Sequence, residues 1–131
     1  MSFDPLWHMG GKRRCLPVIT GFNLNSVGNE STWSIGLPSK YLVLSLRVYD
    51  ASATPVLATA GLFTATGGGG TTLVTPAVLT ALTSASKVTS MTLAAVAGTD
   101  YQTASTLFLR NGTAQGSALT ASFQLEILDL T

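Results

Sequence analysis

Ionic and metal-binding side chains are scarce in this sequence. Only 10% of its 131 residues are charged, and it holds one histidine and one cysteine. Typical globular proteins carry about 25% charged residues. The formal net charge is +1, which provides no whole-protein attraction to nucleic acid or to a membrane surface. We therefore expect neither nucleic acid nor a membrane as a partner.

The residues that carry chemistry are too few and too scattered to form a reactive cluster. A metal site needs clustered His, Cys, Asp or Glu, and a catalytic triad needs a firmly held histidine, whereas His8 lies near the N-terminus. Cys15 has no partner for an intrachain disulfide and is predicted to be a small core residue. Asp100, before Tyr101, is expected to make a turn contact, with calcium binding as the alternative. We therefore expect a protein that is not an enzyme, with no catalytic residue, cofactor or metal.

No long uninterrupted apolar run is present. The charge-free stretch 51–86 is broken by Pro55, Pro76 and four consecutive glycines at 67–70, whereas a membrane-spanning helix needs about 20 mostly apolar residues. The glycines do not match a phosphate-binding loop, which continues Gly-Lys-Ser/Thr, because threonines follow them here. They predict a flexible turn between two strands.

What the sequence has in abundance is alternation with period two, which is typical of β-strands. The alternation places Leu119, Ala121, Phe123, Leu125 and Ile127 on one face of a strand. It runs through residues 41–49 as well, with Tyr41 and Tyr49 on one face. Residues 75–85 suggest one helical turn, and Asn111-Gly112 a hairpin or a longer loop.

Seven or eight such strands, bounded by turn residues, predict an all-β fold. The expected architecture is an antiparallel β-sandwich, jelly-roll-like, with an extended N-terminal arm. We expect the arm at residues 1–14 and a single sandwich domain at residues 15–131. Trp33 is expected in the core, and the short segment around it is expected to be an edge strand.

The densest charge run, Lys12, Arg13 and Arg14, follows Trp7 in the expected arm. Aromatic residues and arginine are common anchors at protein interfaces. These four residues are therefore candidates for an interface with an acidic protein surface. Two alternatives are open: a run that only keeps the arm soluble, and a weak, salt-sensitive contact with nucleic acid.

Residues 38–128 contain an extended strand, the glycine-rich segment, an Ala-x-x-x-x-x-Leu-Thr pattern and a late Thr-Ala-Gln-Gly-Ser-Ala at 113–118. In these features the chain resembles small Ala/Thr/Gly-rich structural proteins of tailed bacteriophages. The resemblance implies a non-enzymatic virion protein, assembled in the cytoplasm of the bacterial host. Its first implied role is a capsid decoration (cement) protein that binds the major capsid protein, with head-fibre, neck or tail accessory roles as alternatives. The sparse charge favours a homo-oligomer, with a trimer preferred.

A second class of function is a carbohydrate-binding module of sandwich fold. Such a module would present exposed aromatic rings on which sugars stack. Tyr41 and Tyr49 are the candidates on one strand, although eight residues separate them by about 27 Å.

Overall fold

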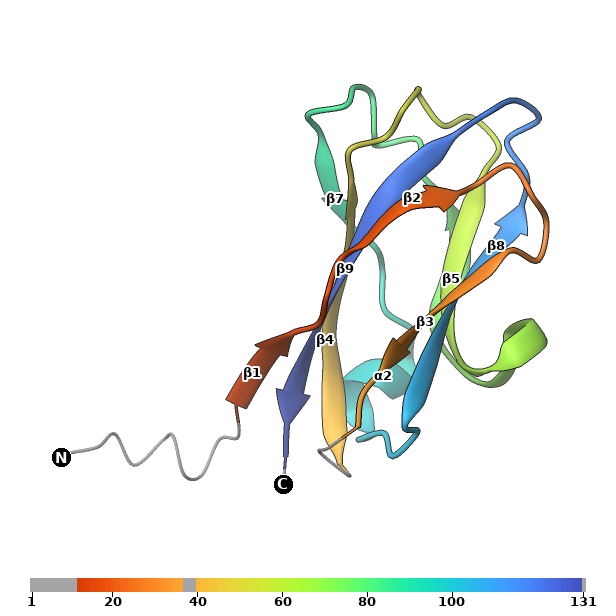
Figure 1. Ribbon diagram of the computed structural model, residues 1–131. Helices are drawn as coiled ribbons and strands as arrows, with labels where there is room; N and C mark the ends of the chain where they lie inside the picture. Colours follow the sequence, from red (N-terminus) through yellow and green to blue (C-terminus); the bar gives the residue numbers. More distant parts are fainter. Residues whose placement is uncertain (1–11, 37–39, 131) are drawn as a thin grey trace, which may run out of the picture.

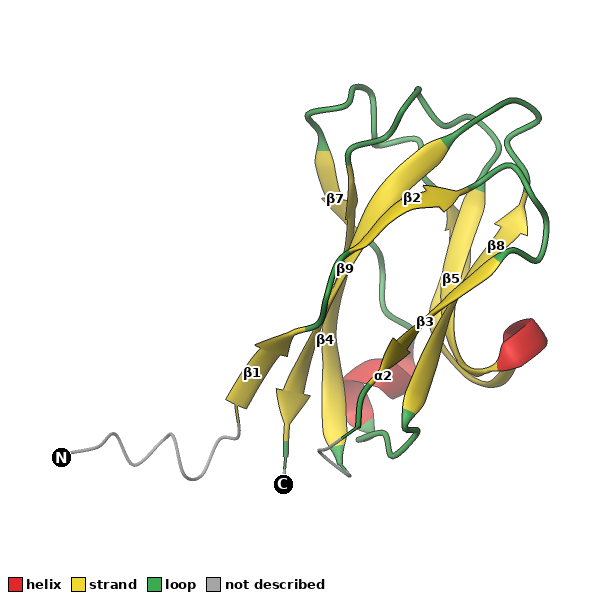
Figure 2. Cartoon of the chain, viewed as in Figure 1, coloured by secondary structure: helices red, strands yellow, loops and turns green. Residues whose placement is uncertain are grey.

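The computed structural model of the protein describes residues 12–36 and 40–130. Two antiparallel sheets face each other in a sandwich (Figure 1). The fold contains very little helix (Figure 2), and this confirms the all-β prediction. The elements are β1 (Lys12–Cys15), β2 (Ile19–Asn23), β3 (Glu30–Ser34), β4 (Tyr41–Tyr49), β5 (Thr59–Ala65), η1 (Thr66–Gly68), β6 (Gly69–Val78), β7 (Val88–Ser90), α2 (Ala95–Thr99), β8 (Thr106–Thr113) and β9 (Thr120–Asp129). Within the described ranges, neither helix has the length and hydropathy to span a bilayer.

The strand order is that of a jelly roll. One sheet runs β1-β9-β4-β7, with β2 also paired to β9, and the other runs β3-β8-β5-β6. The chain passes from one sheet to the other after β2, β3, β4, β6, β7 and β8, so strands adjacent in sequence mostly face each other across the core. β1 and β2 lie along the same side of β9 and are separated around Pro17, which has no backbone N–H to continue the ladder.

The predicted alternation of β9 is confirmed. Its five alternate apolar side chains, from Leu119 to Ile127, are all buried, and the ring of Phe123 meets that of Phe22 edge to face at 5.6 Å. Trp33 is also in the core, as expected, where its Nε1 donates to the Pro17 carbonyl at 2.7 Å. Strand β3, which carries Trp33, is an edge strand as predicted.

The predicted alternation of β4 is only half right. A register shift between Val43 and Ser45 inserts a bulge, and a bulge switches the face to which later side chains point. Tyr41 and Val43 are buried before it, and Leu46 and Val48 after it. Tyr41 and Tyr49 therefore do not share a face.

Three further local predictions are wrong. Cys15 is exposed, because it lies on the edge strand β1 opposite the outward-facing Glu126. Residues 75–85 form the end of β6 and a turn, in which the Leu82 N–H donates to the Leu79 carbonyl. Asn111-Gly112 lies inside β8 and does not form a hairpin turn.

The glycine run is a turn between β5 and β6, as predicted. Gly67 and Gly68 have φ of +72° and +76°, which L side chains rarely adopt. The turn is fastened by Glu30, whose carboxylate accepts from Thr66 Oγ1 at 2.6 Å, from the Gly67 N–H at 2.7 Å and from Arg110 Nη1 at 3.1 Å. Partial burial acts to raise the pKa of Glu30, but these hydrogen bonds outweigh it and the net pKa is lowered.

Asn111 is the buried polar centre of the fold. Its side chain is fully buried; Nδ2 donates to the carbonyls of Thr59 and Thr113, and Oδ1 accepts from the Ser26 N–H. These bonds join β8 to β5 and to the loop between β2 and β3. A buried amide with all its partners in place fixes one arrangement of the strands around it.

We predict that Asn111→Ala destabilises the protein by about 2 kcal/mol or more, because it leaves buried carbonyls unpaired. Urea unfolding measures the loss. The matched control is Asn29→Ala, which removes one exposed side-chain bond to the Asn23 carbonyl and should cost less than about 1 kcal/mol. Equal losses for the two variants would contradict a central role for Asn111.

We predict that Glu30→Gln lowers the free energy of unfolding at pH 7 by about 1–3 kcal/mol. Because the folded-state pKa of Glu30 is lowered, its contribution is present above the unfolded pKa and is lost as the pH falls through the folded pKa. The difference between wild type and variant should therefore shrink from pH 7 to pH 3 in urea titrations. A difference that stays constant over that range would rule out the ionised carboxylate as the cause.

Candidate functional site

The sequence-predicted interface residues do not form a free arm in the described part of the chain. Trp7 lies outside the described residues. Lys12, Arg13 and Arg14 form most of the edge strand β1, paired with β9. Arg13 points to the outer face of the sheet, where its Nη1 lies 3.7 Å from Glu126 Oε2.

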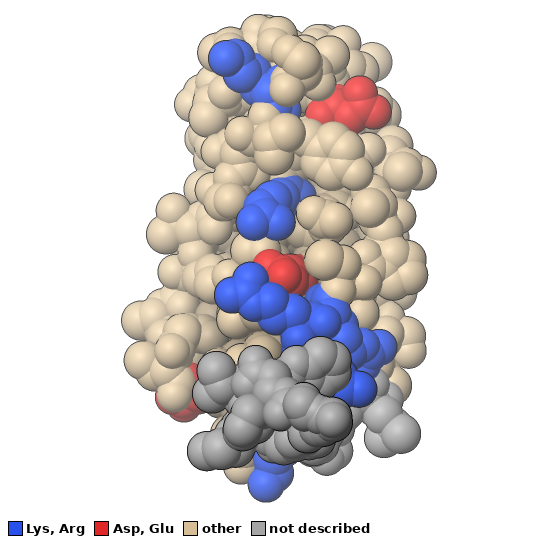
Figure 3. Space-filling model, turned by 90° about the vertical axis from the view of Figure 1, so that its left-hand side faces the viewer, with Lys and Arg blue, Asp and Glu red and all other residues tan. Residues whose placement is uncertain are grey.

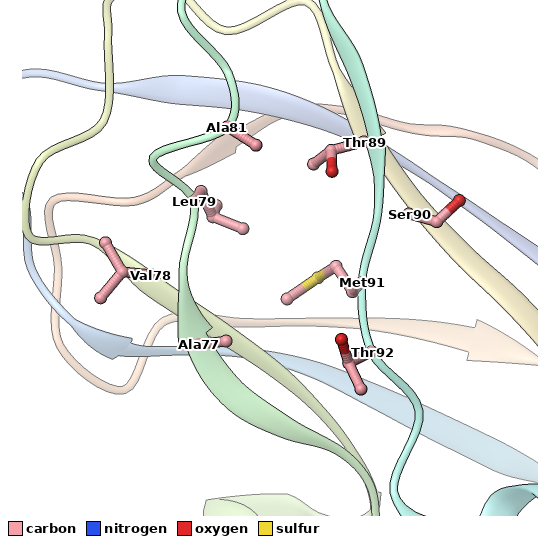
Figure 4. Close-up of a pocket in the computed structure, with 8 residues that line it drawn as sticks. All are labelled: Ala77, Val78, Leu79, Ala81, Thr89, Ser90, Met91 and Thr92. Carbon is pink, nitrogen blue, oxygen red and sulfur yellow. The ribbon is translucent and has the colours of Figure 1, made fainter.

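One hollow lies between the end of β6 and β7, lined by Ala77, Val78, Leu79, Ala81, Thr89, Ser90, Met91 and Thr92. In Figure 4 the side chains of Leu79 and Met91 point toward each other across it, whereas Val78 points away. Its volume is about 100 Å³, well below the roughly 300–1,000 Å³ of small-molecule sites. We interpret it as a packing gap between two edge strands.

A larger depression is lined by residues of the segment that follows helix α2. Helix α2 lies at the end of the sandwich where β4 begins (Figure 1). The depression has a volume of about 510 Å³ and is lined by Thr99, Asp100, Tyr101 and Thr103. The Tyr101 side chain is large, apolar on its faces and 52% exposed. Lys40 places its Nζ over this ring, 5.3 Å from the centroid, within the range of a cation–π contact.

The backbone under this depression is held on both sides of Tyr101. Gln102 exchanges two backbone hydrogen bonds with Tyr41, at 2.7 and 3.1 Å, and its buried side chain donates to the Asp100 carbonyl. The Asp100 N–H donates to the Val96 carbonyl at the end of α2. The segment is thus fixed to β4 and to the helix, while the side chains of Asp100 and Tyr101 remain exposed.

Tyr41 anchors the same segment from inside the core. Its side chain is fully buried, and its hydroxyl donates to the Ala104 carbonyl at 2.6 Å. Burial raises the pKa of Tyr41 to about 12, because the phenolate would lose its solvation there. The phenol therefore stays a hydrogen-bond donor at all physiological pH values.

The depression combines an aromatic face, a carboxylate and two hydroxyls in an open, polar setting. Asp100 makes the turn contact expected of it, since its Oδ1 accepts from Thr99 Oγ1 at 2.9 Å. In residues 12–36 and 40–130, no group of three or more His, Cys, Asp or Glu side chains could hold a metal ion. The aromatic face, the carboxylate and the two hydroxyls of the depression together suit a ligand that has hydroxyl groups around an apolar ring face.

No family model matches the sequence, and no curated protein matches it. Among solved structures, the chain is similar to chitosan-binding module 1 from a chitosanase/glucanase of Paenibacillus sp. IK-5. The two share 14% sequence identity over 89% of this chain and 95% of that chain, with a TM-score of 0.32.

This comparison corrects the prediction of a virion role. This solved structure is a chitosan-binding module, which belongs to the second class named from the sequence and not to capsid decoration proteins. The virion role is therefore abandoned. At 14% identity and a TM-score of 0.32 the likeness transfers neither residues nor a ligand, so function has to be argued from this chain's own surface. Self-association as a trimer stays a prediction.

Sequence reasoning did not identify the Tyr101 depression, although it singled out Asp100 before Tyr101. It took the aromatic pair for sugar stacking to be Tyr41 and Tyr49, whereas Tyr41 is buried. The available signal was an aromatic residue next to a carboxylate in a threonine-containing loop, Thr-Asp-Tyr-Gln-Thr at 99–103. The position of this segment depends on the pairing of Gln102 with Tyr41, 61 positions earlier, which no local sequence pattern reports.

We predict that Tyr41→Phe destabilises the protein by about 1–2 kcal/mol at pH 8, because the Ala104 carbonyl loses its donor. The raised folded-state pKa means that Tyr41 favours folding most below the unfolded pKa of about 10, and that this advantage declines as the pH rises toward 12. Urea unfolding at pH 8, 10 and 11 should therefore show the gap between the two proteins narrowing. A gap that widens with pH would contradict this.

Proposed function

We propose that the protein is a non-catalytic carbohydrate-binding module and that it binds a saccharide in the Tyr101 depression. The observation that carries the proposal is the half-exposed Tyr101 ring beside Asp100, in a depression of about 510 Å³. That volume falls in the range of small-molecule sites.

Each lining group matches a part of a sugar. The electron-rich face of an aromatic ring packs against the C–H face of a pyranose, which is apolar and slightly positive. A carboxylate such as that of Asp100 accepts hydrogen bonds from neighbouring hydroxyls. The Thr103 hydroxyl can donate and accept, and the Thr99 hydroxyl, whose proton is donated to Asp100, can accept. One ring and three polar side chains suffice to orient one sugar unit.

Preorganisation supports the proposal as well. The backbone of residues 100–102 is fixed by bonds to Val96 and Tyr41, so binding does not have to order the loop. A site that is already ordered loses less entropy when a ligand binds. This matters for an open site, where contacts are few.

We predict that Tyr101→Ala lowers the affinity for a bound oligosaccharide about tenfold or more, which corresponds to about 1.4 kcal/mol. Tyr101→Phe, which keeps the ring, should retain most of the affinity. Isothermal titration calorimetry with acidic, neutral and cationic oligosaccharides measures both variants, and chitosan oligosaccharides serve as the cationic series.

The matched control is Val56→Ala, an exposed apolar residue that lies outside the depression. It should bind as the wild type does, and all variants should show wild-type urea midpoints. The proposed function is wrong if the wild type binds no oligosaccharide of any charge, or if Tyr101→Ala binds as well as the wild type.

A further inference from the structure

The cations of the chain gather on one side of the molecule. Of its seven Lys and Arg residues, six lie on the five-stranded sheet or directly beside its strands, namely Lys12, Arg13, Arg14, Lys40, Arg47 and Lys87. Figure 3, which views this side, shows blue side chains arranged in a column over the surface. Three carboxylates, Asp50, Glu126 and Asp129, belong to the same sheet and its ends, which leaves this side with a net charge of +3.

Three of these cations form what we call the basic face: Arg13, Lys40 and Arg47, all exposed. Arg47 lies opposite Gln124 of β9, and Arg13 lies opposite Leu128. Those positions are four residues apart, or about 13 Å along β9. The basic face thus extends from the middle of the sheet to the end at which β4 begins.

The basic face is continuous with the Tyr101 depression through Lys40. Lys40 directly precedes β4, and its backbone carbonyl accepts a hydrogen bond from the Leu130 N–H. The Nζ of Lys40 lies over the Tyr101 ring. From Tyr41 to Arg47 the strand covers about 20 Å. This is long enough for several sugar units in line, one in the depression and others along the sheet.

Neutral hydrogen-bonding groups lie between the cations of the basic face. Gln124 and Ser90 flank Arg47 in the register of the sheet, and Ser45 lies opposite Glu126. Cations interspersed with amides and hydroxyls complement a chain that carries both negative charges and many hydroxyls. A nucleic-acid backbone fits less well, because three cations neutralise few phosphates and single-strand binders present successive aromatic platforms.

We propose that the ligand is an acidic polysaccharide, held by one sugar unit in the Tyr101 depression and by its anionic groups along the basic face. This inference rests on the proposed function and names its substrate class. Glu126 moderates the basic face: its carboxylate lies 3.7 Å from Arg13 Nη1 and accepts from Ser45 Oγ at 3.4 Å. An ion pair with one partner as exposed as Arg13, at 73%, holds its arginine only weakly, so Arg13 is available to a ligand carboxylate.

The test measures the affinity of the full chain for polygalacturonate, a neutral xylan, chitosan oligosaccharides and single-stranded DNA, at low and high NaCl. We expect polygalacturonate to bind most tightly, and its affinity to fall at least tenfold from 50 to 500 mM NaCl, because exposed charges are screened by salt. Arg13→Ser/Arg47→Ser should lower the affinity for polygalacturonate about tenfold, and Glu126→Gln should raise it severalfold.

The matched control is Lys87→Ser, which removes one charge at the other end of the sheet, beside Val88 and Tyr49; it should change the affinity less than twofold. A Tyr101-dependent preference for xylan or chitosan oligosaccharides overturns the inference and leaves the proposed function standing. Tighter binding of DNA than of polygalacturonate overturns the inference as well. Failure to bind any of the three glycans overturns the proposed function itself.

Discussion

The pairing of β9 with strands on both of its sides is the constraint on which the rest of the structure depends. β4 lies on one side, β1 and β2 lie on the other, and the inward side chains of β9 fill the centre of the core. Residues 12–15, at the start of the described chain, are thereby held against its C-terminal strand. Because β1 is fixed in this way, Arg13 occupies a defined place on the sheet, and the basic face is a property of the folded state.

The sequence predicted the class of fold because side-chain alternation is a direct consequence of strand geometry. It also predicted the glycine turn, which needs conformations that only glycine adopts freely. It could not predict the bulge in β4, because the alternation of Leu and Val continues through it unchanged. For the same reason it placed Tyr41 on the same face as Tyr49.

The candidate site escaped prediction for a different reason. The lining residues of the Tyr101 depression all lie between positions 99 and 103, but the residues that contact this segment are remote in sequence: Tyr41 is the first residue of β4, and Lys40 precedes it. The net charge of +1 was likewise uninformative, because it is the sum of +3 on the side of the five-stranded sheet and a negative charge on the rest of the chain. The order of the strands in each sheet determines which charged residues share a surface, and no local sequence pattern predicts that order.

Cations on an exposed strand have a second physical explanation, because lysine and arginine on edge strands prevent sheets from pairing edge to edge. That explanation suits Arg13, which lies on the edge strand β1. It does not suit Arg47, which lies on β4 between β9 and β7, where both edges of the strand are already paired. Nor does it suit Lys40, whose ammonium group lies over the Tyr101 ring. Edge protection therefore accounts for one of the three residues of the basic face, whereas the proposed ligand would contact all three.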